Sequence, residues 1–252
     1  MIAILRRILT AGLLAGLVAG LAFTAVQQLK VEPLILAAEV YEEAEAAPAA
    51  HTHDSAAAAH DHATTGQSHD AAAWSPADGF ERIAYTVVAN ILAGVGYGCI
   101  LVAGMVFAGR KLDWRRGLLW GLGGFAAFAF APALGLPPEL PGMAAADLAG
   151  RQLWWIATAL ATAAGLGLIV FAPIKLRIAA VAVGVALIVL PHLIGAPEHA
   201  AESGALPAEL AARFAVASLI AQAAFWAALS AVAGHLLGRA LPATALPRSV
   251  AA

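Results

Sequence analysis

The sequence alternates between long runs without charged residues and short connections that carry the charges. Six runs of 20 to 27 residues lack Asp, Glu, Lys and Arg: Ile8–Leu29, Ile83–Gly109, Gly117–Pro138, Gln152–Ile174, Ile178–Pro197 and Phe214–Gly238. A helix rises about 1.5 Å per residue, so about 20 residues cross a hydrocarbon core of roughly 30 Å. Because a helix satisfies its own backbone hydrogen bonds in lipid, the pattern predicts an all-α, polytopic membrane bundle of about six transmembrane helices.

Composition supports a lipid environment. The 252-residue chain is 62% hydrophobic and 12% charged, whereas soluble domains have roughly 45–50% apolar and about 25% charged residues. One aqueous core of this size cannot bury such an excess. The single cysteine, Cys99, excludes an intrachain disulfide. No basic stripe or recognition motif indicates nucleic acid as a partner.

The basic residues are unequally distributed between the connections on the two sides of the membrane. If the N-terminus is cytoplasmic, ten of the fourteen lie inside: Arg6, Arg7, Arg110, Lys111, Arg115, Arg116, Lys175, Arg177, Arg239 and Arg248. Lysine and arginine in short loops resist translocation. We therefore expect both termini in the cytoplasm.

The runs divide the chain into four segments. Residues 1–30 form a first transmembrane helix, 31–82 an extracytoplasmic His/Asp/Glu-rich loop, 83–238 a five-helix transmembrane core and 239–252 a cytoplasmic tail. The alternative for the first segment is a cleaved signal peptide, which would leave five spans. The apolar part of a signal peptide is about 7–15 residues long, so the longer run here favours an uncleaved helix.

Small residues recur every fourth position in the first two runs: Gly12, Gly16, Gly20, Gly94 and Gly98. This spacing lets helices approach closely in lipid. We expect ordinary packing within the bundle, and the alternative is a dedicated dimer face.

The outer loop begins with an acidic helical stretch and continues into a low-complexity tract. Five of the eight histidines lie in that tract: His51, His53, His60, His62 and His69. Neutral imidazole is a good ligand for divalent cobalt, nickel, copper and zinc. A flexible tract loses chain entropy when it binds, so we expect metal capture of weak to moderate affinity. The alternative is a solvated linker without a role.

A histidine at the outer end of the fifth run is a second candidate. His192 lies in Leu190–Pro197, and an ionisable group at this depth is a functional candidate. Pro191 lacks a backbone N–H and tends to break or kink a helix. A similar proline-rich break at Ala131–Gly142 contains Glu139. We expect a shared outer vestibule containing His192 and Glu139; the alternative is an interfacial histidine bonded to a carbonyl.

Polar side chains near the outer ends of the first two spans are pathway candidates: Gln27, Gln28, Glu32 and Asn90. Gln152, Gln222 and His235 also lie within apolar runs. Most such residues form hydrogen bonds between helices. The chain has no Walker motif, no His-Glu-x-x-His pair and no Gly-x-Ser-x-Gly elbow, so we expect neither nucleotide binding nor an enzyme.

Distinctive short motifs occur along nearly the whole chain: Thr24–Ile35, Glu39–Glu42, Trp74–Gly79, Trp114–Gly121, Pro132–Gly142, Arg151–Trp155, Leu190–Pro197 and Pro207–Leu210. In these motifs the chain resembles the CbtA family of predicted cobalt transporter subunits. The resemblance implies about five spans in a bacterial inner membrane, and a small single-span partner of the CbtB type.

The resemblance also implies import of divalent cobalt for cobalamin synthesis, with the ion as substrate and no tightly bound cofactor. Two alternatives stay open. One is a non-transporting metal-binding or scaffold subunit of the membrane, and the other is a nickel or zinc permease.

Overall fold

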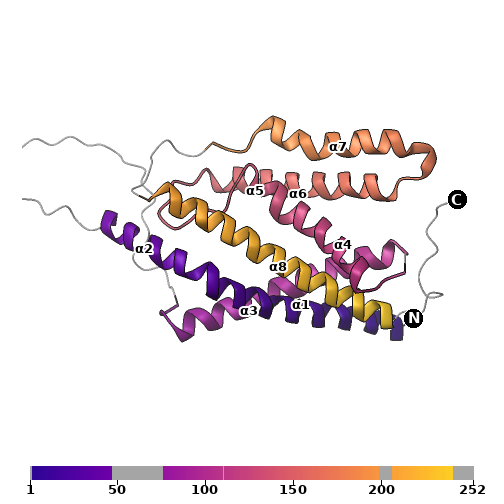
Figure 1. The fold of residues 1–252 in the computed structure, drawn as a ribbon, viewed down its shortest axis with the longest axis horizontal. Coiled ribbons are helices and arrows are strands. Elements are labelled where there is room, and N and C mark those ends of the chain that lie inside the picture. The colour runs from indigo at the N-terminus through magenta and orange to yellow at the C-terminus, as the bar shows by residue number, and fades with distance from the viewer. Residues whose placement is uncertain (1, 47–75, 110, 199–205, 241–252) are drawn as a thin grey trace, which may run out of the picture.

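The computed structural model of the chain describes residues 2–46, 76–109, 111–198 and 206–240. These residues form helices and turns, with no strand among them. In chain order the elements are α1 (Ile2–Lys30), α2 (Glu32–Ala46), α3 (Phe80–Phe107), α4 (Trp114–Phe125), η1 (Ala126–Phe130), α5 (Ala131–Ala133), α6 (Leu148–Phe171), η2 (Ile174–Leu176), α7 (Arg177–Ile194) and α8 (Ala208–Ala240). Figure 1 shows the long helices lying roughly along one direction, as in a membrane bundle.

The predicted all-α polytopic fold is confirmed. Five helical segments in the described chain are long and apolar enough to cross a membrane: α1, α3, α6, the η2–α7 unit and α8. The acidic stretch after the first span is also helical, as predicted, and forms α2.

The third predicted span, Gly117–Pro138, differs from a single regular helix. The structure builds it from α4, a π-helical turn (η1) and the three residues of α5. The N–H of Ala131 donates to the carbonyl of Ala126, five residues earlier, and Pro132 follows with no N–H to donate. The sequence pattern counts apolar residues, but it does not report this change of helical register. The third span is therefore the composite one.

Four helices form the main body of the bundle. α1 packs along both α3 and α8, and α4 crosses α8 on the side away from α1. The buried core contains Ala15, Met105 and Leu229 from the first three of these helices. α8 lies at the centre of these contacts, because it packs against each of the other three helices.

Glycines allow two of these contacts to be backbone to backbone. A Cβ atom on Gly16 would lie 2.5 Å from backbone atoms of Gly94, and one on Gly12 would lie 3.4 Å from Gly98. The glycine spacing of α1 and α3 thus serves packing inside one chain, as expected. On the other side of the body, Gly117 of α4 lies against the backbone of Ser230 in α8.

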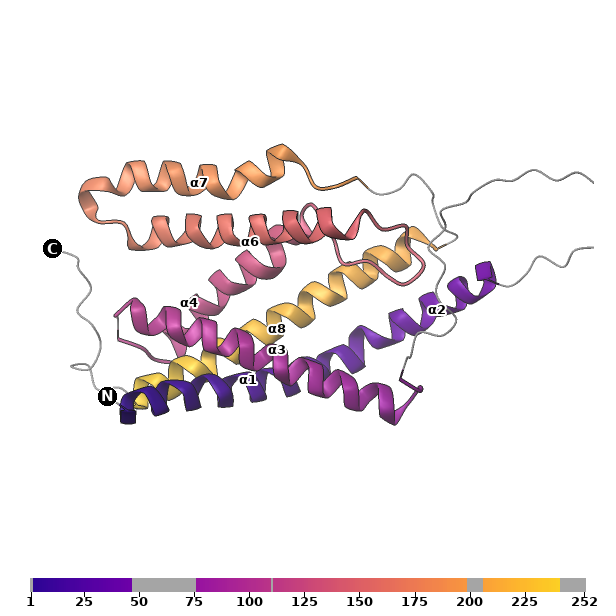
Figure 2. The ribbon, with the colours of Figure 1, turned by 180° about the vertical axis from the view of Figure 1, so that it is seen from behind.

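α6 and α7 form an antiparallel hairpin beside this body. Figure 2 shows α7 as the outermost helix, and its main contacts are with α6. Pro191 was expected to break or kink α7, but the helix runs on to Ile194 and ends at Gly195, which has a φ of 91°. The expectation of a helix break at Pro191 is therefore wrong. Pro191 cannot donate to the carbonyl of Leu187, four residues earlier, but the helix continues for one more turn, and the N–H of Gly195 donates to the carbonyl of Pro191.

The two ends of the bundle carry opposite charges. At the end where α1 begins and α8 finishes, the Arg7 guanidinium donates to the carbonyl of Ala240 at 2.9 Å. We name this the basic end, because the turns there carry Lys111, Arg116 and Lys175. The opposite end, where α2 lies and α6 begins, carries most of the described acidic residues, and we name it the acidic end.

Candidate functional site

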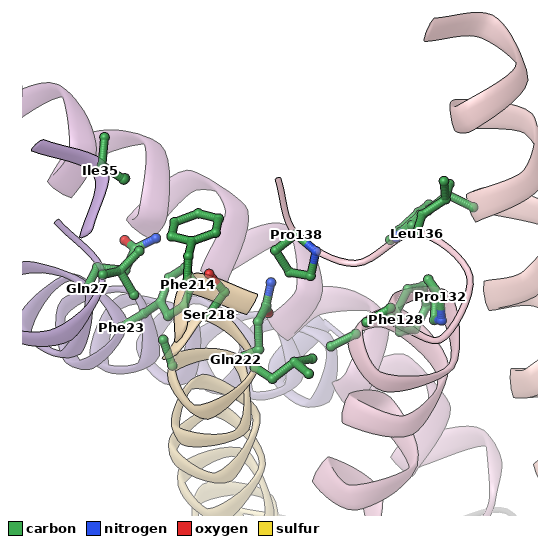
Figure 3. Close-up of a pocket in the computed structure, with 16 residues that line it drawn as sticks. Phe23, Gln27, Ile35, Phe128, Pro132, Leu136, Pro138, Phe214, Ser218 and Gln222 are labelled. Atoms are coloured by element: carbon green, nitrogen blue, oxygen red, sulfur yellow. The ribbon is translucent and has the colours of Figure 1, made fainter. Parts of the chain in front are cut away.

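A cavity of about 320 Å³ opens among the helices at the acidic end. Its walls come from α1, the start of α2, the first half of α8, the η1–α5 segment with the chain after it, and α6. In Figure 3, Gln27 lies on one side, Ser218 and Gln222 lie in the middle, and Pro132 and Pro138 lie on the other side. The cavity thus joins segments that are far apart in the sequence.

The polar groups in the cavity come from two helices. Gln27 lies on α1, while Ser218 and Gln222 lie one turn apart on α8. The side-chain oxygen of Gln27 accepts a hydrogen bond of 2.5 Å from the amide of Asn90, which also donates to the hydroxyl of Thr24 at 3.0 Å. This network fixes Gln27 in position at the α1–α3 contact.

The η1 turn supplies the opposite wall. Phe128 and Ala129 of η1 line the cavity, together with Pro132. In a π-helical register the carbonyl of Ala127 would accept a hydrogen bond from the N–H of residue 132, five residues later. In an α-helical register the carbonyl of Phe128, four residues before Pro132, would accept from the same N–H. A proline has no N–H, so residue 132 serves neither carbonyl. π-turns of this kind are frequent at functional sites.

Aromatic rings close the cavity toward the basic end. Phe23 and Phe128 line the cavity and also contact the rings below it. Phe23 lies 5.4 Å from Phe225, Phe128 stacks at 5.6 Å on Trp226, and Tyr97 lies 5.3 Å from Trp226, all measured between ring centroids. We call these five residues the aromatic floor. The aromatic floor thus lies on the side of the cavity that faces the basic end.

Arg82 holds α2 against the start of α3. Its guanidinium pairs with Glu39, with Glu32 at 3.5 Å and with Asp78 at 3.1 Å. Glu32, a predicted pathway residue, is therefore engaged in an ion pair. Because Val31 and Ile35 line the cavity, this clamp also fixes one of the cavity walls.

The two proline-rich segments expected to form a vestibule do meet. A Cβ on Gly135 would lie 3.1 Å from the Cβ of Ala196, and it would also collide with the Trp154 ring. Trp154 is 8% exposed, and its indole N–H donates to the carbonyl of Pro191 at 3.2 Å. The space expected to be a vestibule is thus occupied by the Trp154 side chain.

His192 and Glu139 both lie beside the start of α6. The His192 ring contacts Trp154 edge to face at 5.7 Å, and its Nε2 is buried without a hydrogen-bond partner. Glu139 forms an ion pair with Arg151 at 2.6 Å, and its side chain is 9% exposed. The two residues thus have different partners on α6. No group of three or more His, Cys, Asp or Glu side chains within the described ranges is placed to hold a metal.

The other predicted site residues have mixed placements. Gln27 and Asn90 are brought together, whereas Gln28 is half-buried and does not line the cavity. The tract histidines lie outside the described residues, and their role as metal ligands stays a prediction: His51, His53, His60, His62 and His69. Gln222 was noted in the sequence as a polar residue within an apolar run, whereas Ser218 was not singled out.

A sequence model of one protein family matches residues 5–238, which is nearly the whole chain, and describes a probable cobalt transporter subunit, CbtA. No curated protein and no solved structure matches the chain.

Proposed function

Because the chain belongs to the CbtA family of probable cobalt transporter subunits, we propose that it carries divalent cobalt into the cell as the polytopic subunit of an inner-membrane transporter. The match over residues 5–238 is the observation that carries the proposal. The fold supports it, because five segments can cross a membrane and a cavity opens between them. A subunit implies partners, and a small single-span protein of the CbtB type is the one we propose.

The sorting of charges supports the direction of transport. Basic connections gather at one end of the bundle and acidic residues at the other. By the positive-inside tendency the basic end faces the cytoplasm. The acidic end, with the cavity and the segment that continues into the histidine tract, then faces outward. The cavity is thus open to the side from which an imported ion arrives.

The ion would meet nitrogen ligands before it meets the cavity. The tract histidines raise the local metal concentration, and the tract follows α2 directly in the chain. His192 offers a buried Nε2 that has no hydrogen-bond partner. An imidazole nitrogen in that state is a good ligand for a divalent transition metal. The membrane potential supplies about 4.6 kcal/mol per 100 mV for two inward-moving charges.

Uptake of radiolabelled cobalt in cells with and without the chain, with the partner subunit present in both, tests the proposal. We expect uptake to fall to background when the chain is deleted. Replacing all five tract histidines by alanine should raise the cobalt concentration for half-maximal uptake more than it lowers the maximal rate. Unchanged uptake after deletion contradicts the proposal.

The purified chain and its partner in sealed vesicles separate transport from scaffolding. A transporter moves cobalt into the lumen, whereas a metal-binding scaffold leaves it outside. Competition by nickel and zinc in the same vesicles decides which ion is the substrate.

A further inference from the structure

Most of the wall of the cavity at the acidic end is apolar. Thirteen of its sixteen lining residues have apolar side chains, and the other three are Gln27, Ser218 and Gln222 (Figure 3). Its volume is about 320 Å³, whereas packed protein interiors contain few voids larger than a water molecule. Apolar cavities bind apolar ligands more readily than water. The walls therefore favour a ligand that has a hydrocarbon part.

Two basic residues stand beside the outer end of this cavity. Lys30 directly precedes the lining residue Val31 at the end of α1, and Arg213 directly precedes the lining residue Phe214 near the start of α8. Both basic residues are exposed. Neither forms an ion pair with another residue of the described ranges. The outer end of the cavity thus has two positive charges beside it that no described carboxylate neutralises.

The other two basic residues at the acidic end have protein partners. Arg82 and Arg151 are both paired with carboxylates. In the proposed orientation this end faces outward, where lysine and arginine are less frequent, so the partner of each one is informative. The phosphate of a lipid headgroup lies at the ends of membrane-spanning helices and attracts nearby lysine and arginine. Lys30 and Arg213 therefore favour a ligand that carries a phosphate.

Charged, polar and apolar groups follow one another in depth on two helices. On α1, Lys30 lies about 4.5 Å beyond Gln27 and about 10 Å beyond Phe23 along the helix axis. On α8, which runs in the opposite direction, Arg213 lies about 7.5 Å before Ser218. Both helices give the same order from the acidic end inward: a base, a neutral hydrogen-bonding group, and then the apolar walls. A phospholipid has its phosphate, its ester groups and its acyl chains in that order.

We propose that this cavity binds an anionic phospholipid. One acyl chain fills the cavity toward the aromatic floor, and the phosphate lies against Lys30 and Arg213. The ester carbonyls accept hydrogen bonds from the Ser218 hydroxyl and the Gln27 amide, whose oxygen is already bonded to Asn90. This ligand is distinct from the transported ion, so the inference goes beyond the proposed function. An ion enters the cavity only after the chain has left.

Native mass spectrometry of the purified full-length chain, released from detergent, tests the headgroup. The probes are phosphatidylglycerol, which is anionic, and phosphatidylcholine with the same acyl chains. We expect saturable binding of phosphatidylglycerol, tighter than that of phosphatidylcholine. Replacing Lys30 and Arg213 together by glutamine should weaken phosphatidylglycerol binding roughly fivefold per residue. Lys175→Gln combined with Arg177→Gln is the matched control, because both residues are exposed at the basic end, and it should bind like the wild type.

Filling the cavity tests the position of the acyl chain. Ala133→Phe places a ring on a lining residue and should weaken phosphatidylglycerol binding roughly tenfold, because displacement of two buried methylenes already has that effect. Ala157→Phe is the control, because Ala157 is an exposed residue of α6 that does not line the cavity. If Ala133→Phe is not monodisperse, phosphatidylglycerol with a photoreactive diazirine at the chain end replaces it. In the wild type this probe should label residues 128–138 or 214–222.

Three results overturn the inference. They are equal binding of the two lipids, wild-type affinity in the Lys30 and Arg213 double variant or in Ala133→Phe, and photolabelling confined to outer faces such as α7, which would indicate annular lipid only. The binding assay contains no cobalt and requires no transport. A chain that binds the lipid but takes up no cobalt would end the proposed function and keep the lipid site, whereas cobalt uptake without lipid binding does the reverse.

Discussion

The basic half and the acidic half of this bundle are packed by different rules. In the middle and toward the basic end, helices meet through glycines, so that α1 lies on the backbone of α3 and α4 lies on that of α8. Toward the acidic end, contacts are made by ion pairs, an indole and a π-turn, and a cavity of about 320 Å³ stays open. The boundary between the two halves is the aromatic floor.

This difference separates the rigidly packed half of the bundle from the half that can bind a ligand. Helices whose backbones are in direct contact fit together in one arrangement, and no space for a ligand is left between them. In the acidic half, the buried Nε2 of His192 has no hydrogen-bond partner. A buried polar atom without a partner costs free energy, so its presence is explained more readily by a ligand than by stability. Three substitutions test this contrast, beginning with the largest expected effect on stability.

Gly94→Leu should damage the packed half severely. Any Cβ at Gly94 collides with the backbone oxygen of Gly16, which cannot move without separating α1 from α3. Overpacking of this kind costs about 1–3 kcal/mol and sometimes more, so we expect a large fall in melting temperature and in the monodisperse fraction in detergent. Gly96→Leu is the control, because a Cβ at Gly96 has no atom within 4 Å. If both variants melt alike, the close α1–α3 contact is wrong.

Glu139→Gln should have an intermediate effect. It removes the charge from a pair in which Glu139 is 9% exposed and leaves Arg151 beside a neutral amide. Loss of such a partner costs about 1–3 kcal/mol. Asp113→Asn is the matched control at the basic end, because it weakens an exposed pair with Arg116 and should cost at most about 0.5 kcal/mol. Melting temperatures of the two variants measure the difference, and equal shifts contradict a special role for the Glu139–Arg151 pair.

His192→Phe should change stability least. Phenylalanine keeps the edge-to-face contact with Trp154, and the lost Nε2 had no hydrogen bond to give up. We expect a change within about 0.5 kcal/mol, together with a clear loss of maximal cobalt uptake. His235→Phe, an exposed histidine near the basic end, should keep both properties. Normal uptake by His192→Phe would remove His192 from the proposed route.

Much of the fold could be predicted from the sequence, and less of the site. Apolar runs of the right length predicted the helices, because lipid permits few other backbone structures. The glycine spacing predicted close helix packing within the bundle, and the structure shows that α1 and α3 form the close pair. Gln27 and Asn90 were singled out as polar residues in spans, but their hydrogen bond joins two helices, and no pattern within one helix shows it. The π-turn before Pro132 was missed, because hydrophobic counting is blind to helical register.

The vestibule prediction shows the same limit. The two proline-rich segments were expected at one end of the bundle, and they do lie together. What fills the space between them is Trp154, which the sequence analysis included only as part of the Arg151–Trp155 motif.

The sequence by itself determined that this chain is a helical membrane protein, which segments are helices, and which charges gather at each end. Those properties depend on local composition and on the length of each run. The tertiary structure alone decided where the cavity lies, that its walls are neutral, and that Arg82 and Arg151 neutralise the nearby carboxylates. These depend on which faces of distant helices meet, and that is set by packing across the whole bundle.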